Sequence, residues 1–274
     1  MTTPADGAVV AGVGPAEESM QVVRLAAREA ATHDRPLALL HAFNWEAAFE
    51  TPGGVTRDDA ENLIERAAAT ASDVEPAVPV SGEIVEGSPV TALIRRSESA
   101  YLVAIGDGGM AGCVRCVPAD APAVQLAARA GCPVLVVRSQ PPPAGPVLVG
   151  VDRSTSSRTA LDFAFAEAAR RSARLLAVQV TDPGRPRDDQ LLLDLVSHAA
   201  RRHPTVAAEC HTISGDPGTV LLEQSRSAQV SVVGARGDEA WRGMLGEVSQ
   251  SLLYHSPGPV IVVRGLAPPP PDGA

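Results

Sequence analysis

Short apolar runs alternate with longer amphipathic stretches throughout the second half of the chain. The runs have the length and the Val, Ile and Leu content of buried strands, whereas the stretches between them space their apolar residues as helices do. The pattern predicts strands at 146–151, 173–180, 205–213, 229–234 and 259–263, and helices at 157–172, 188–202, 216–227 and 248–255. Strands that alternate with helices in this way form a parallel sheet with helices on both faces.

The first half of the chain repeats blocks of the second half in the same order and at nearly constant separation. The matched blocks are 9–14 with 147–152, 26–31 with 164–169, 86–94 with 214–222, 99–109 with 227–237, and 132–138 with 258–264. Such duplication indicates two copies of one fold. We expect domains at 1–138 and 147–265.

Proline-rich segments separate and end the two predicted domains. The linker 139–146 contains three successive prolines. Proline has no backbone N–H to donate, so this segment is expected to be an extended, semi-rigid connector. The tail 266–274 is expected to be disordered. The runs 133–137 and 259–263 would be apolar fifth strands at sheet edges, and open apolar edges invite pairing. We therefore expect these two strands to meet within the chain in a pseudo-two-fold arrangement.

Length and composition fit two domains with ordinary cores. The chain has 274 residues, of which 45% are hydrophobic but only 3% aromatic, so the cores must consist mainly of Ala, Val and Leu. The formal net charge of −9 argues against nucleic acid or an anionic membrane as the main partner. No apolar run approaches the roughly 18 residues of a membrane span, and the N-terminus lacks the pattern of a signal peptide. We expect a soluble, cytoplasmic protein.

Ligands of such sheets bind beyond the carboxyl ends of the strands, where the strand order reverses. That edge should carry Asp152, Val180 and the glycine-rich loop that follows Val233. Glycines let backbone amides turn toward an anion, and a helix N-terminus adds free donors. The loop nevertheless carries more acidic than basic residues over 234–249.

Three segments together resemble the universal stress proteins. They are VGVDRSTSSRTALDFA (149–164), GARG (234–237) and GEVSQSLLYHSPGPVIVVR (246–264), and the repeat makes the chain similar to a tandem member of that family. The resemblance implies two tandem Rossmann-like (HUP-type) α/β domains, each a five-stranded parallel sheet flanked by helices. It also implies pairing through fifth strands, and it leaves a homodimer open. Some members bind ATP and others do not.

The resemblance implies an adenine-nucleotide site in the second half, with Asp152 at the nucleoside. The residues expected there are Asp152, Val180, Gly234, Arg236, Gly237, Gly246, Glu247, Val248 and Ser249. The match to the ATP-binding motif is partial, because eight residues instead of nine separate Gly237 from Gly246, and Glu247 replaces a Ser or Thr. ATP binding is therefore expected to be weak or absent.

The first half departs further from the motif. Gly106 and Gly109 match, but Ala119 and Asp120 stand where a Gly and a hydroxyl residue are expected, and Gly14 replaces the Asp. We expect at most one nucleotide per chain. His41, at the end of the second strand, is a weak candidate for a ligand contact in this half.

Two readings of Glu247 remain open. Its carboxylate could accept the helix donors itself, so that the loop supplies its own anion, or it could hold Mg²⁺ on a nucleotide. Asp152 could likewise form a turn and cap a helix instead of contacting a nucleoside. Arg236 and Arg242 could pair with phosphates, or with Asp238 and Glu239.

The remaining polar residues suggest no catalysis. No Ser–His–acid or paired-carboxylate arrangement can be assembled from their spacing, so we expect no catalytic residue, no metal site formed by the protein alone and no enzyme activity. Cys113 and Cys116 form a CxxC, which supplies only two of about four zinc ligands, with Cys132 as a candidate third. They could be a reversible dithiol or incidental thiols. The favoured function is a non-catalytic stress-response module. The alternatives are a slow ATP hydrolase or phosphotransfer enzyme, and a nucleotide-free scaffold.

Overall fold

The computed structural model describes residues 7–43, 56–108, 121–184, 189–236 and 244–264. The first half contains β1 (Val9–Gly12), α1 (Ser19–Thr32), β2 (Leu37–Phe43), α3 (Arg57–Val74), β3 (Val80–Glu86), α4 (Pro89–Ser97), β4 (Leu102–Gly106), α5 (Pro122–Arg129) and β5 (Val134–Val137). The second half contains β6 (Val147–Gly150), α6 (Thr155–Arg170), β7 (Leu175–Thr181), α7 (Asp189–Ala200), β8 (Ala208–Ser214), α8 (Pro217–Ser225), β9 (Val230–Gly234), α9 (Glu247–His255) and β10 (Val260–Val263).

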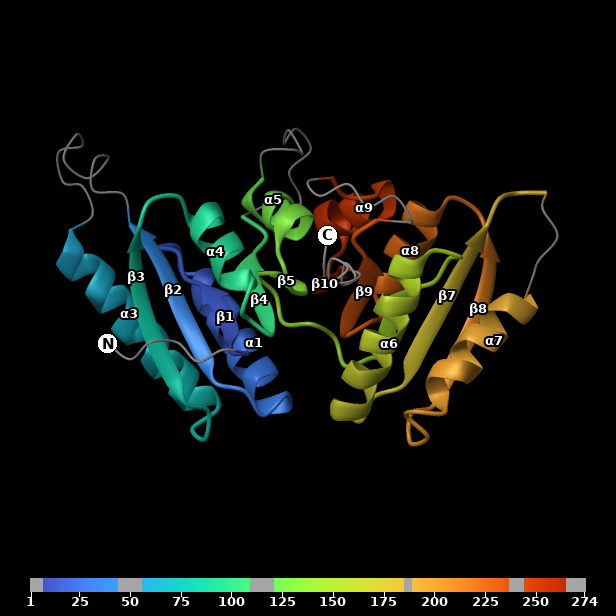
Figure 1. Cartoon of the computed structure of the whole chain (residues 1–274), viewed down its shortest axis with the longest axis horizontal. Coiled ribbons are helices and arrows are strands. Elements are labelled where there is room, and N and C mark those ends of the chain that lie inside the picture. Colours follow the sequence, from blue (N-terminus) through green and yellow to red (C-terminus); the bar gives the residue numbers. More distant parts are fainter. Residues whose placement is uncertain (1–6, 44–55, 109–120, 185–188, 237–243, 265–274) are drawn as a thin grey trace, which may run out of the picture.

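The ten strands form one continuous sheet in the order β3-β2-β1-β4-β5-β10-β9-β6-β7-β8. Strands β6 to β10 correspond to β1 to β5, so each half has the same strand order when it is followed from the outer edge to the centre. Neighbours within each half are parallel, as the alternating pattern predicted, whereas β5 and β10 are antiparallel. Their register places Ile261 opposite Leu135 at the centre of the molecule. The predicted meeting of the fifth strands is therefore what the structure shows (Figure 1).

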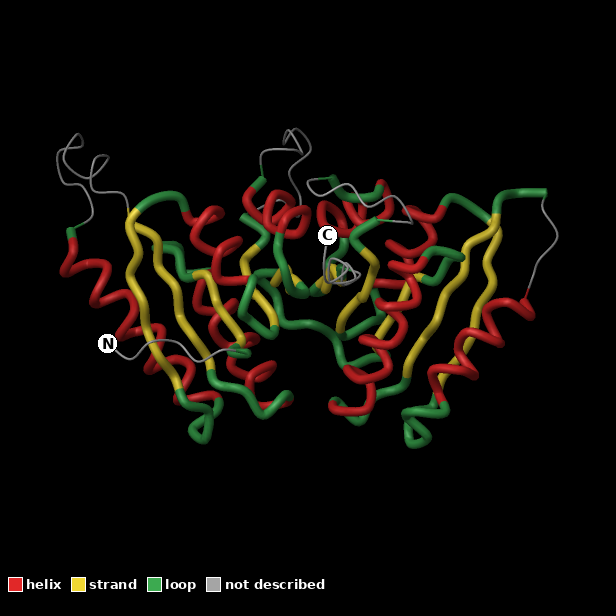
Figure 2. Tube along the Cα trace, in the orientation of Figure 1, coloured by secondary structure: helices red, strands yellow, loops and turns green. Residues whose placement is uncertain are grey.

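Helices cover both faces of the sheet, as Figure 2 shows. One buried cluster contains residues of α1, α3, α6 and α7, and a second contains residues of α4, α5, α8 and α9, so each face is covered by helices of both halves. The central strands β5 and β10 are buried along their whole length, which explains their uninterrupted apolar sequences. The cores are rich in Ala, Val and Leu, and Phe165 is among the few aromatic residues in them.

Capping residues move some helix ends from their predicted positions. Helix α6 begins at Thr155, two residues earlier than predicted, because the Ser154 side chain accepts a hydrogen bond from the Ser157 amide at 3.1 Å. The Asp216 side chain caps α8 in the same way, so this helix begins at Pro217, one residue later than predicted. Strand β8 begins at Ala208, three residues later than predicted.

Two arginines join the halves at equivalent positions. Arg138 follows β5 and donates to the carbonyls of Leu252 and Leu253, near the end of α9, at 3.0 and 2.8 Å. Arg264 follows β10 and donates to the carbonyls of Ala127 and Ala128, near the end of α5. Each arginine thus meets the negative end of a helix in the opposite half.

The predicted tail 266–274 lies outside the described residues. In the part of the chain that the structure describes, no helix has the length and apolar character needed to span a membrane.

Candidate functional site

A cavity of about 240 Å³ opens at the carboxyl ends of β6, β7 and β9. Strand β6 lies between the other two, and the chain leaves it toward β7, so this is the place where the strand order of the second half reverses. All the predicted site residues that are described line this cavity: Asp152, Val180, Gly234, Arg236, Gly246, Glu247, Val248 and Ser249. Gly237 lies outside the described residues.

Gly234 sets the approach of α6 to the end of β9. A Cβ atom at this position would lie 2.3 Å from the hydroxyl oxygen of Ser156, so a side chain here would push the first turn of α6 away. Ser249 Oγ donates to the Gly234 carbonyl at 2.6 Å, and the Gly246 amide donates to the Ala235 carbonyl at 2.8 Å. These bonds hold the start of α9 beside the cavity.

Asp152 forms the turn that begins α6, which is one of the two roles open to it. Its Oδ1 atom accepts hydrogen bonds from the amide of Ser154 at 2.8 Å and from its hydroxyl at 2.5 Å. The Asp152 amide donates to Ser157 Oγ at 2.9 Å. The residue is exposed, and no bond from the described residues reaches its Oδ2 atom, which can meet a ligand hydroxyl.

The prediction that Glu247 accepts the donors of its own helix is wrong. Gly246 is the N-cap residue of α9, and among the described residues no side chain is seen to cap this end. Glu247 is the first helical residue, and its side chain is exposed. Within the described residues the Glu247 carboxylate, at the rim of the cavity, accepts no hydrogen bond from the amides of the first turn. Its charge still lies at the positive end of the helix.

The first half keeps a cavity at the equivalent edge, with a volume of about 670 Å³. The Gly14 amide donates to Ser19 Oγ at 2.8 Å, which reproduces the Asp152–Ser157 bond without the carboxylate. His41 also lines the cavity, but it is buried and its Nδ1 atom donates to the Val13 carbonyl at 2.8 Å. The predicted motif residues Gly109, Ala119 and Asp120 lie outside the described residues.

A sequence model described as the universal stress protein family matches residues 7–138 and 144–264. The chain belongs to the universal stress protein family. Universal stress proteins from Mycolicibacterium smegmatis and Mycobacterium tuberculosis (strain H37Rv) are 32% and 31% identical to it, each over 93% of this chain and 96% of the relative.

Solved structures agree with the fold. The crystal structure of a universal stress protein from Archaeoglobus fulgidus superposes with a TM-score of 0.71 at 20% identity, and it covers 94% of this chain and 96% of that chain. A functionally unknown protein from Pseudomonas aeruginosa gives a TM-score of 0.65 at 15% identity, with 96% and 94% covered. Both align with both halves of this chain, so the tandem arrangement is shared.

The cavity of this universal stress protein has walls that sequence reasoning missed. Leu221 reaches it from α8, and Val178 and Val233 complete an apolar surface behind Asp152. The hydrophobic periodicity of 216–227 identified a helix, but nothing in its sequence showed which of its apolar residues would face the strand edge.

Cys132, the candidate third zinc ligand, lies between α5 and β5. The residue is buried, and burial raises the pKa of its thiol to about 12, so the thiol stays protonated. Cys113 and Cys116 lie outside the described residues, and their role stays a prediction.

Proposed function

We propose that this chain is a non-catalytic, cytoplasmic stress-response module that binds one adenine nucleotide in its second half. The observation that carries the proposal is the convergence of Asp152, Gly246 and the first turn of α9 on one cavity at the reversal of strand order. Nucleotide binding would stabilise this half or signal its state, without turnover. We further propose that 1–138 and 147–265 are its two domains.

Each part of a nucleotide would meet suitable chemistry in the cavity. The apolar surface formed by Val180, Leu221 and Val233 suits an adenine ring, and Asp152 Oδ2 suits a ribose hydroxyl. The free amides at the start of α9 suit a phosphate. A cavity of about 240 Å³ falls below the roughly 300–1,000 Å³ of typical small-molecule sites, so the phosphates would extend into the glycine-rich loop.

Calorimetric titration with AMP, ADP and ATP tests this proposal. We expect no more than one nucleotide per chain, and at least about tenfold weaker binding in Asp152→Asn, since the variant loses a hydrogen bond to a charged acceptor. Asp162→Asn, which changes an exposed carboxylate on α6, the helix that follows Asp152, is the matched control. Two equivalent sites would contradict the proposal that only the second half binds a nucleotide. Absence of binding would favour a scaffold, and steady hydrolysis of ATP would favour the enzyme.

Replacing Glu247 with Ser is expected to raise ATP affinity by roughly tenfold or more. The change removes a negative charge beside the cavity and adds a hydroxyl donor, and a hydrogen bond to a charged group contributes about 1.5–3 kcal/mol. If Glu247 instead holds Mg²⁺, the variant should bind MgATP more weakly and metal-free ATP unchanged. Calorimetry with and without Mg²⁺ separates the two outcomes. Glu223→Ser, an exposed acid on α8, is the control. If the affinity is unchanged in both conditions, the spacing between Gly237 and Gly246, and not the charge of Glu247, determines ATP affinity.

A further inference from the structure

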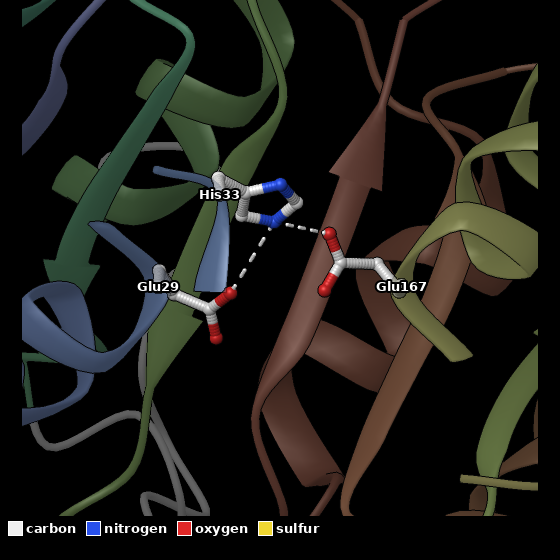
Figure 3. Close-up of side chains that lie close together, drawn as sticks. All are labelled: Glu29, His33 and Glu167. Carbon is white, nitrogen blue, oxygen red and sulfur yellow. Dashed lines mark ion pairs between the residues drawn. The ribbon is translucent and has the colours of Figure 1, made fainter. Parts of the chain in front are cut away.

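A buried cluster of ionisable side chains lies where the two halves meet, away from the nucleotide cavity. Glu29 on α1, His33 at the end of α1 and Glu167 on α6 converge there (Figure 3). Their exposed fractions are 4%, 4% and 0%. Helix α6 begins beside the cavity at Thr155 and ends at Arg170, so the cluster lies at the opposite edge of the sheet (Figure 1). The proposed function does not use these residues.

The pseudo-two-fold symmetry explains why the carboxylates meet. Glu29 and Glu167 occupy equivalent places in the repeated blocks 26–31 and 164–169. Residues that are equivalent under a two-fold axis come together when they lie near it. The residue equivalent to His33 is Arg171, so the two halves place different side chains at this position. One half supplies a neutral or charged imidazole where the other supplies a permanent cation.

The three donor atoms lie close together. His33 Nε2 lies 2.7 Å from Glu167 Oε1 and 3.8 Å from Glu29 Oε2, and all three atoms lie within 4.8 Å of one another. The shorter distance is an ion-pair distance, and within the described residues none of the three buried atoms makes a regular hydrogen bond. Figure 3 shows the ring nitrogen between the two carboxylate oxygens. The three atoms therefore face a common point.

Arg171 fixes the orientation of both carboxylates from outside the cluster. Its Nη2 atom pairs with Glu29 Oε1, and its Nε atom donates to Glu167 Oε2 at 2.9 Å. Each carboxylate is thus held by one oxygen and presents the other to His33. Hydrogen bonds of this kind, made to the outer atoms of ligating side chains, orient metal ligands in proteins.

The cluster lacks one positive charge. Two carboxylates and one guanidinium lie together in a buried place, so the carboxylates outnumber the permanent cation that pairs with them. Tyr101 packs against the His33 ring with centroids 4.6 Å apart, and Arg35 lies over Tyr101, so no further acidic group faces the ring from this side.

We propose that Glu29, His33 and Glu167 bind one divalent transition-metal ion, of which Zn²⁺ is the representative, across the two halves of the chain. One imidazole nitrogen and two carboxylate oxygens are a donor set that suits Zn²⁺, and tetrahedral Zn–N and Zn–O bonds of roughly 2.0–2.2 Å place donors roughly 3.3 Å apart. A solvent molecule completes the coordination. The ion joins α1 to α6 and stabilises the contact between the halves. The sequence analysis expected no such site.

Zinc stoichiometry and affinity test the proposal. The full-length chain with Cys113→Ser and Cys116→Ser, which removes the competing thiols, is equilibrated with ZnCl₂, desalted and measured by elemental mass spectrometry. We expect one zinc per chain, and a melting temperature that rises with zinc. Glu167→Gln and His33→Gln should each lower zinc affinity at least about 100-fold, because loss of a ligand exceeds the roughly 10–100-fold cost of losing an outer partner. Asp162→Asn, an exposed carboxylate on the same helix, should bind zinc normally.

Defined results would overturn the proposal. The first is a parent that retains no zinc. The second is zinc that both ligand variants retain with unchanged affinity, which would mean an adventitious ion only. A melting temperature that responds to pH but not to zinc would identify a proton as the missing charge. If a ligand variant does not fold, the stoichiometry of the parent and the absorption spectrum of its Co²⁺ form decide, since tetrahedral nitrogen and oxygen ligation has its own visible bands. ATP binding is measured in the same samples, so failure of the nucleotide proposal remains distinguishable.

Discussion

Replacing Arg138 with Met is expected to lower the free energy of unfolding by about 3–5 kcal/mol, which is the usual cost of removing one partner from a buried ion pair. The Arg138 side chain is 3% exposed and pairs with Asp107, whose own side chain is 14% exposed, at 3.1 Å. The variant would remove the guanidinium from this carboxylate and from the carbonyls of Leu252 and Leu253, of which Leu252 keeps the Ser256 amide as a donor. Met retains much of the apolar volume, so lost packing contributes little.

Urea denaturation of the variant and its parent measures this effect. Arg174→Met is the matched control, because Arg174 pairs with Glu209 at the surface and exposed pairs are worth about 0–1 kcal/mol. The expected order is a large loss for Arg138 and a small loss for Arg174. Equal losses would show that the contact of Arg138 with the end of α9 does not hold the halves together.

Replacing Gly145 with Ala is expected to destabilise the chain by about 1–3 kcal/mol or more, because the added methyl group has no space. A Cβ atom at Gly145 would lie 1.9 Å from the carbonyl oxygen of Ser227 and 3.0 Å from its carbonyl carbon. Both partners are backbone, so the connector itself must move. Gly145 also accepts a hydrogen bond from Gln229 Nε2 at 2.6 Å, which that movement would disturb.

Thermal unfolding of Gly145→Ala should show a melting temperature several degrees below that of the parent, at roughly 2–4 °C per kcal/mol for a chain of this size. Gly14→Ala is the control, because nothing lies within 4 Å of a Cβ atom there and no positive φ is required. A melting temperature equal to that of the parent would mean that the connector does not pack against the turn after α8.

The sequence by itself determined the architecture of this universal stress protein. Apolar runs and amphipathic stretches located the described strands and helices of the second half to within a few residues. They could do so because residues buried on one face of a strand or helix recur at the period of that element. Because the first half repeats blocks of the second, the same elements were expected there in the same order. The meeting of β5 and β10 also followed, because two apolar edges in one chain are most readily covered by each other.

The candidate nucleotide site was largely predictable for a related reason. In a parallel sheet the carboxyl ends of neighbouring strands share one edge, so Asp152, Val180 and Gly234 had to lie near one another. Side-chain orientation did not follow from this rule. The exposed position of Glu247 and the contribution of Leu221 depend on where α9 and α8 begin and how they rotate against the sheet.

Only the tertiary structure decided what lies between the halves. Arg138 meets the end of α9 from a position more than a hundred residues away in the chain, and Glu29 meets Glu167 at a similar separation. Each of these residues lies in a segment whose local pattern predicts nothing more than a strand end or a helix face. The pseudo-two-fold packing brings equivalent positions of the repeat together, and that packing places Glu29, His33 and Glu167 in one buried cluster with Arg171 against it.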